Sequence, residues 1–140
     1  MDDFEPLIIA FACNWCSYAA SDVAGVSRCY YPANVRIIRV MCTGMIDPIY
    51  ILKAFEGGAD GVLVAGCRPG DCHYISGNIK AEKMVSRLRT LLHRLGLEDE
   101  RLRLQWISTG EGTLFAKTIE DMVSQLKAKD PLPFKVRQGH

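Results

Sequence analysis

The sequence lacks a surplus of charge of either sign. Seventeen lysines and arginines stand against sixteen aspartates and glutamates, a formal net charge of +1. A dedicated nucleic-acid-binding protein needs a clustered basic surface, so this balance argues against that class. No apolar run approaches the ~20 residues of a membrane-spanning helix. The first residues are acidic, whereas a signal peptide begins with a basic region. We therefore expect a cytoplasmic protein that binds neither nucleic acid nor membrane.

Cysteine, in contrast, is abundant: the 140 residues include six. A disulfide framework is typical of small secreted domains that cannot build a core. A chain of this length buries roughly two-thirds of its unfolded surface and can build its own core. Metal, redox or nucleophilic chemistry is therefore the better interpretation of the thiols.

Two kinds of segment alternate along the chain. Apolar or β-branched runs predict buried strands, and the segments between them have the three- and four-residue spacing of helices. We expect strands at residues 7–12, 35–41, 61–65 and 101–107, helices at 16–29, 48–56 and 79–95, and a last helix that follows Ser108 and includes residues 115–126.

Local signals predict where the helices begin, end and pack. Asp47 followed by Pro48 is a helix start, and the pair Gly57-Gly58 and the single Gly96 are stops. Ser108 with Glu111 resembles a capping box. The expected inward stripes are Ile49, Leu52 and Phe55 in the second helix; Met84, Val85, Leu88, Leu91, Leu92 and Leu95 in the third; and Phe115, Ile119, Met122, Val123 and Leu126 in the last.

The alternation of strand and helix predicts an α/β fold. Strands that alternate with helices pair in parallel through right-handed crossovers, with helices on both faces of the sheet. We predict one doubly wound domain over residues 1–130, with a four-stranded, flavodoxin-like sheet of order 2-1-3-4. Residues 131–140 contain two prolines and no periodicity, and we expect a C-terminal tail there.

Five of the six cysteines are predicted to meet at one edge of this sheet. Ligands of open parallel sheets gather at the carboxyl ends of the strands, and these cysteines end a strand or follow one closely: Cys13, Cys16, Cys42, Cys67 and Cys72. Cys29 is expected at the opposite edge, as a small buried hydrophobe.

The spacing of these cysteines suits a metal centre. Cys13-x2-Cys16 and Cys67-x4-Cys72 each let one turn or loop offer two thiolates, and both iron–sulfur clusters and structural zinc take four. A redox cluster is favoured because this fold does not need zinc to form. A thioredoxin-type dithiol would leave three thiols unexplained. We identify no catalytic residues, because neither paired carboxylates nor a Ser-His-Asp set can be argued.

Three separated motifs resemble one family. They are residues 12–19 (ACNWCSYA), 39–44 (RVMCTG) and 61–74 (GVLVAGCRPGDCHY), and residues 101–108 (RLRLQWIS) also fit. Together they are similar to the delta subunit of methyl-viologen-reducing, F420-non-reducing hydrogenase, over roughly residues 5 to 130.

The resemblance implies a cytoplasmic iron–sulfur protein with a [2Fe–2S] cluster. It implies an electron relay from a hydrogenase, through its small subunit, or from a formate dehydrogenase subunit, to the flavin-bearing subunit of heterodisulfide reductase. That complex would bifurcate electrons in methanogenesis or a related anaerobic metabolism.

The family's cysteines match Cys13, Cys16, Cys42, Cys67 and Cys72. Of these, we favour Cys42, Cys67, Cys72 and one of the first two as cluster ligands. The alternative function is a thiol-disulfide or zinc-binding regulatory module.

Overall fold

The structure is a computed structural model that describes residues 6–13, 35–40, 46–66, 77–107 and 111–129. The elements in these residues are β1 (Ile8–Cys13), β2 (Val35–Val40), α2 (Pro48–Glu56), β3 (Gly61–Gly66), α3 (Gly77–Arg94), the 3₁₀ turn η2 (Asp99–Arg101), β4 (Leu102–Trp106) and α4 (Gly112–Lys127). The helix expected at 16–29 and the tail expected at 131–140 lie outside the described residues.

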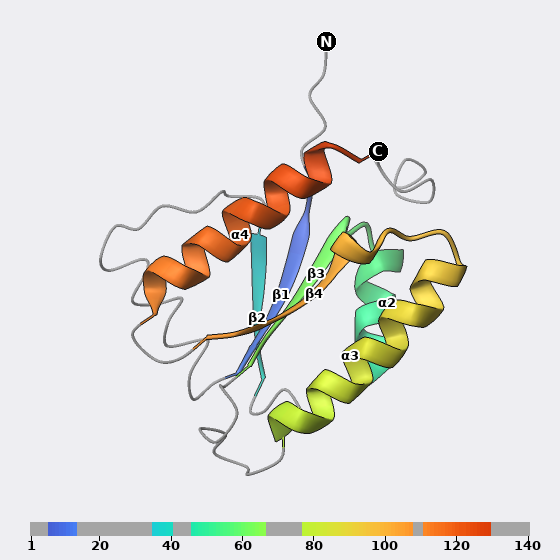
Figure 1. The fold of residues 1–140 in the computed structure, drawn as a ribbon, viewed down its shortest axis with the longest axis horizontal. Coiled ribbons are helices and arrows are strands. Elements are labelled where there is room, and N and C mark those ends of the chain that lie inside the picture. Colours follow the sequence, from blue (N-terminus) through green and yellow to red (C-terminus); the bar gives the residue numbers. More distant parts are fainter. Residues whose placement is uncertain (1–5, 14–34, 41–45, 67–76, 108–110, 130–140) are drawn as a thin grey trace.

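The four strands form one parallel sheet in the order β2-β1-β3-β4, as Figure 1 shows. This confirms the predicted order 2-1-3-4. β3, which is buried along its whole length, is an uninterrupted run of small and apolar residues, the pattern of a parallel strand covered on both faces.

The described helices cover both faces of the sheet, which confirms the doubly wound arrangement. α4 lies on one side of the strands, and α2 and α3 lie on the other (Figure 1). Alternate residues of each strand therefore face different helices. In β1, Ala10 belongs to the cluster packed with α4, while Phe11 belongs to the cluster packed with α2 and α3.

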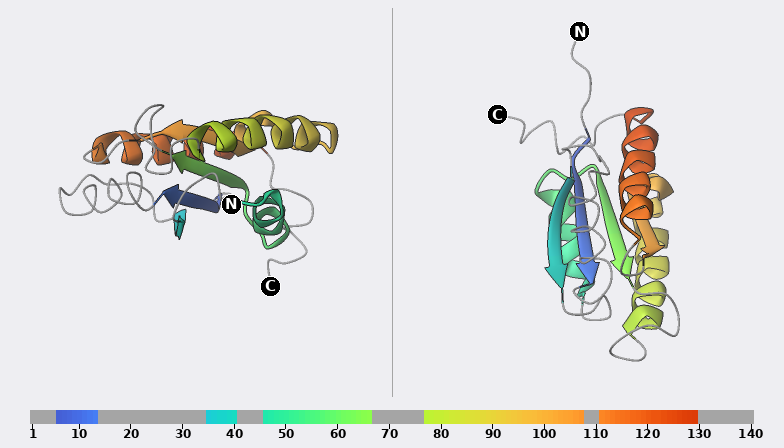
Figure 2. Two further views of the ribbon diagram at one scale, coloured as in Figure 1. Left: turned by 90° about the horizontal axis from the view of Figure 1, so that it is seen from below. Right: turned by 90° about the vertical axis from the view of Figure 1, so that its left-hand side faces the viewer.

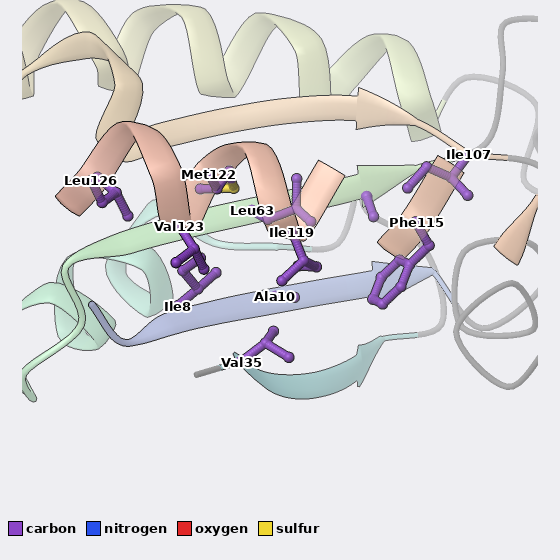
Figure 3. Close-up of a cluster of buried hydrophobic side chains, with 11 residues drawn as sticks. Ile8, Ala10, Val35, Leu63, Ile107, Phe115, Ile119, Met122, Val123 and Leu126 are labelled. Atoms are coloured by element: carbon purple, nitrogen blue, oxygen red, sulfur yellow. The ribbon is translucent and has the colours of Figure 1, made fainter. Parts of the chain in front are cut away.

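α4 buries one continuous stripe against the sheet. Its inward side chains point toward Ile8, Leu63 and Val35 on the strands (Figure 3). All five residues expected to form this stripe are buried: Phe115, Ile119, Met122, Val123 and Leu126. The contact is close, because a Cβ placed on Gly61 of β3 would lie 2.7 Å from a methyl group of Leu126.

The inward stripe predicted for α2 is wrong in part. Ile51 and Phe55 are the buried residues of this helix, whereas Ile49 is 47% exposed. A helix of two and a half turns with apolar residues on two sides can be rotated to bury either side. Here the side with a four-residue step is the one that faces the sheet.

The stripe predicted for α3 is also too wide. Val85, Leu88 and Leu92 are buried, but Leu91 and Leu95 are 48% and 66% exposed. Leu91 and Leu95, which directly follows the helix, border hollows that this segment shares with α2. The three-and-four periodicity identified the helix but did not limit how much of its apolar surface the sheet covers.

The ends of the helices follow the local signals. The Asp47 carboxylate accepts a hydrogen bond from the Ile49 backbone N–H at 3.0 Å, which confirms the predicted N-cap of α2. Gly58 and Gly96 follow α2 and α3 with positive φ angles of 114° and 95°, conformations that only glycine adopts readily. Ser108 lies outside the described residues, and the N-cap Glu111 of α4 makes no side-chain capping bond.

Candidate functional site

The carboxyl ends of the strands form one nearly level edge. Cys13, the last residue of β1, pairs with Val40, the last residue of β2. Its neighbour Ala12 pairs with Ala65 of β3, and Gly66, which ends β3, pairs with Trp106, which ends β4. The arrowheads of β1, β2 and β3 accordingly finish together in Figure 2, right. We refer to this end of the sheet as the carboxyl edge.

The structure describes one of the predicted site residues, and of that residue only the backbone. Cys13 is the last residue of β1, as expected, and therefore lies at the carboxyl edge. Cys16, Cys42, Cys67 and Cys72 lie outside the described residues, as does Cys29. Along the chain, Cys42 comes two positions after the end of β2 and Cys67 directly after the end of β3.

The described helices all begin near the carboxyl edge, because each follows a strand and runs back across the sheet (Figures 1 and 2). The N-terminus of a helix carries a partial positive charge and unpaired N–H groups. The edge therefore has an electrostatic bias toward negatively charged groups.

Metal-ligating side chains do not gather elsewhere in the described part of the chain. Within it, no group of three or more histidine, cysteine, aspartate or glutamate side chains is close enough to hold a metal ion. His93 lies in the last turn of α3, far along the helix from the carboxyl edge, and its Nδ1 lies 3.2 Å from a carboxylate oxygen of Asp99.

A buried ionic cluster that sequence reasoning missed lies at the opposite, amino edge. Arg101 was expected to begin the fourth strand, but it belongs to η2 and is only 1% exposed. Its guanidinium donates to the backbone oxygen of Asp60 at 3.0 Å and to the carboxylate of Glu98. This cluster joins β3 to the start of β4 and serves structure; no sequence signal distinguishes Arg101 from the exposed arginines.

Several hollows open on the face covered by α2 and α3, and two of these are grooves that reach the first turn of α2. One, of about 530 Å³, is lined mainly by apolar residues of β1, β2 and α2, among them Ile38 and Tyr50. The other, of about 450 Å³, lies between the start of α2 and the first half of α3. The second groove is the nearer to the carboxyl edge, since both helices begin there.

Comparison with known proteins identifies the family. The model of the family described as methyl-viologen-reducing hydrogenase, delta subunit, matches residues 8–128, which include all four strands and the three described helices. The chain belongs to this family. The resemblance seen in the cysteine motifs is thereby confirmed over nearly the whole chain.

Individual members of the family are similar along their whole lengths. The vhc iron–sulfur subunit of an F420-non-reducing hydrogenase from Methanococcus voltae is 49% identical over 138 residues, 99% of this chain and 96% of that one. The corresponding iron–sulfur subunit from Archaeoglobus profundus is 45% identical over 134 residues, 96% and 98% of the two chains.

A third relative is much longer. It is a subunit of the ferredoxin:CoB-CoM heterodisulfide reductase of Methanosarcina mazei, 47% identical over 135 residues, which are 96% of this chain but 17% of that one. A segment similar to this chain is thus part of a longer polypeptide in that protein.

Among the helices described here, none is long and apolar enough to cross a membrane.

Proposed function

We propose that this chain is an electron-transfer subunit that carries a [2Fe–2S] cluster at its carboxyl edge. It would pass electrons from a hydrogenase, or from a formate dehydrogenase, to the flavin-bearing subunit of heterodisulfide reductase in a cytoplasmic, electron-bifurcating complex. Such a cluster, when bound, takes up and releases one electron at a time. The chain needs no acid or base for this, which agrees with the absence of a catalytic set from its sequence motifs.

The register of the strands is the main observation in support of this proposal. Parallel strands lie about 4.8 Å apart, so Cys13 is close to the end of β2. Two further residues of chain reach at most about 7 Å, which limits the distance of Cys42 from that strand end. The distance of Cys67 from the end of β3 is limited more tightly, because Cys67 is bonded directly to Gly66. The register therefore supports a site at the carboxyl edge to which Cys13, Cys42 and Cys67 would contribute.

The donor set suits iron. Thiolates are the usual ligands of [2Fe–2S] clusters, and four are required. We propose Cys42, Cys67 and Cys72 with one of Cys13 and Cys16. A cluster with four thiolates is anionic, and the helix N-termini at the carboxyl edge would stabilise that charge.

The relatives support the proposed partners. The hydrogenase proteins from Methanococcus voltae and Archaeoglobus profundus are named as iron–sulfur subunits. In the Methanosarcina mazei protein, a segment similar to this chain is joined covalently to the rest of a heterodisulfide reductase polypeptide. Covalent linkage keeps two modules at high effective concentration, as an electron relay and its acceptor require.

Spectroscopy on the anaerobically purified chain tests this proposal. We expect visible colour, a rhombic EPR signal after reduction, and about two iron and two sulfide ions per chain, the content of one [2Fe–2S] cluster. A colourless chain that contains zinc, or no metal, would contradict the proposal and favour the thiol-disulfide or zinc-binding module.

Single Cys→Ser variants test the ligand set. Cys42→Ser, Cys67→Ser and Cys72→Ser should each lose most of the bound iron, while Cys29→Ser, the matched control, should keep it. Cys13→Ser and Cys16→Ser should differ from one another, since only one of these thiols is needed as a ligand. Full iron content in all three of the first variants would overturn the assignment.

A further inference from the structure

The groove between α2 and α3 has an apolar floor. It is lined by Pro48 at the start of α2 and by Met84, Leu88 and Leu91 of α3. Leu88 is buried, whereas Leu91 is 48% exposed. Part of the apolar lining of the groove is therefore accessible to solvent. Pro48 is the first residue of its helix, which places one end of the groove close to the carboxyl edge.

Exposed apolar side chains are unevenly distributed over the molecule. Among the described residues, those that are large, apolar and exposed lie on β2, on α2, on α3 or directly after α3, and none lies on α4: Ile38, Ile49, Tyr50, Ile79, Leu91 and Leu95. Scattered exposed apolar residues are normal, but a set confined to one part of the surface indicates an interaction surface. The groove lies within this part.

The rim of the groove is basic. Lys80, Lys83 and Arg87 are exposed and line it, and among the residues that the structure describes no carboxylate does. Their spacing of three and four residues places them on one side of α3, with neighbouring Cβ atoms about 5–6 Å apart. Within the described part of the chain, no ion pair to these three side chains is formed. The nearest acidic residue in the sequence, Glu82, does not line this groove; it lines a neighbouring hollow, together with Lys83 and Arg87.

The position of these cations costs the isolated chain stability. Two of them lie in the first two turns of α3, whose first turn has no acidic residue. Positive charge at a helix N-terminus opposes the macrodipole, and like charges one turn apart repel each other. An acidic partner seated on the groove would relieve both effects.

We propose that this groove is the docking surface for an acidic, apolar-centred surface of the flavin-bearing heterodisulfide reductase subunit. This inference rests on the proposed function. Basic and apolar residues together match a protein surface that carries carboxylates around apolar side chains. Docking here would cover a face that begins at the carboxyl edge and would bring the electron acceptor close to the cysteines.

Other possible occupants of the groove match its basic rim and apolar floor less well. Residues 131–140 include Lys135 and Arg137 and no acidic side chain, so the three rim cations would repel this segment. Nucleic acid would leave the apolar floor uncovered, and the chain as a whole carries a formal charge of only +1. A second copy of the chain is an outcome that the experiment distinguishes.

Charge reversal tests the surface. Full-length Lys83→Glu/Arg87→Glu protein is compared with Lys117→Glu/Lys127→Glu protein, in which exposed lysines of α4 on the opposite face receive the same change of charge. Calorimetry measures the affinity of each for the purified flavin-bearing subunit. We expect the groove variant to bind at least about tenfold more weakly and the control variant within about twofold of the unchanged protein. The difference should shrink from ~50 mM to ~500 mM salt, because salt screens exposed charges.

Photo-crosslinking tests the occupant. A benzoylphenylalanine placed at Leu91 should crosslink to the flavin-bearing subunit, and one placed at the exposed Glu120 of α4 should not. A crosslink from position 91 to a second copy, to residues 131–140 or only to a hydrogenase partner would overturn the proposal, as would equal affinities of the two charge variants.

The iron content and reduced EPR spectrum of every variant are recorded alongside. They should match the unchanged protein, because the substituted residues lie on the outer surface of helices. If the protein without substitutions contained no cluster, the proposed function would be refuted. If the groove variant kept its cluster and bound the flavin-bearing subunit as tightly as the protein without substitutions, only the docking surface would be refuted.

Discussion

Arg101 is a structural residue, although in the sequence it cannot be distinguished from an exposed, charged side chain. Its side chain is buried, and it donates to the Asp60 backbone oxygen and to the Glu98 carboxylate. Asp60 in turn accepts a hydrogen bond from the Leu7 backbone N–H at 2.8 Å. These contacts join the entries of β1, β3 and β4 at the amino edge. A buried arginine is tolerated only when its donors are satisfied.

Glu98 should make the stability of the chain depend on pH. The hydrogen bond from Arg101 lowers the pKa of the Glu98 carboxyl below its ordinary value of 4.5. A carboxyl whose pKa is lowered on folding contributes stability above its unfolded pKa, and this contribution is lost as pH falls through the folded pKa. Since Glu98 is 40% exposed, we expect Glu98→Gln to cost on the order of 1 kcal/mol near neutral pH.

Urea unfolding at several pH values checks this prediction. The difference between Glu98→Gln and the unchanged protein should begin to shrink as the pH falls below about 4.5, the ordinary pKa of the carboxyl. It should vanish below the lowered pKa of the folded state, where both side chains are uncharged. Glu120→Gln, on the exposed side of α4, is the control and should have no effect at any pH. A difference that is constant with pH would show that Glu98 acts only through packing.

At the scale of the element, α2 shows which features of a helix are determined by residues close together in the sequence. Its start is encoded by Asp47 and Pro48, and the structure has it there, with the expected capping bond. Which side faces inward is not encoded in the same way. Ile49 and Ile51 are equally apolar, but only Ile51 is buried, because the rotation of the helix is set by the shape of the sheet it packs against.

Removal of the α2 cap should destabilise the chain. We expect Asp47→Ala to lower the free energy of unfolding by about 0.5–2 kcal/mol, since the Ile49 N–H loses its acceptor. Asp47→Asn should cost much less, because the amide oxygen also caps well. Chemical denaturation of both variants measures this effect, and equal losses would show that the negative charge matters and the hydrogen bond does not.

At the scale of the whole molecule, the residues that the structure describes form two hydrophobic core clusters. One joins α4 to one face of the sheet, and the other joins α2 and α3 to the opposite face. Full burial of each large aliphatic or aromatic side chain contributes about 1.5–3 kcal/mol. Such a core can stabilise a chain of this length without a metal.

Removal of iron should therefore leave the fold in place. We expect a chelator to bleach the proposed cluster while the far-UV circular dichroism and a cooperative urea transition persist. A moderate decrease in the transition midpoint is expected, because a bound cluster stabilises the folded state by mass action. Loss of the cooperative transition on bleaching would show that the cluster is needed for folding, as the metal is in zinc fingers.

The sequence by itself determined the order of the described strands and helices, the parallel sheet of order 2-1-3-4 and the buried stripe of α4. It also determined that cysteines follow the strand ends. These features depend on local periodicity and on the right-handed crossover, which act along the chain. The cysteine motifs likewise pointed to the delta-subunit family, whose model matches residues 8–128.

Only the tertiary structure decided which apolar residues stay exposed and which charged ones become buried. Leu91 and Ile49 satisfy the helical pattern but face outward, while Arg101 resembles a surface residue but is enclosed. Burial depends on how far neighbouring elements extend and how they are rotated, and that is a property of packing between distant segments. The same packing places Lys80, Lys83 and Arg87 beside an apolar floor near the carboxyl edge.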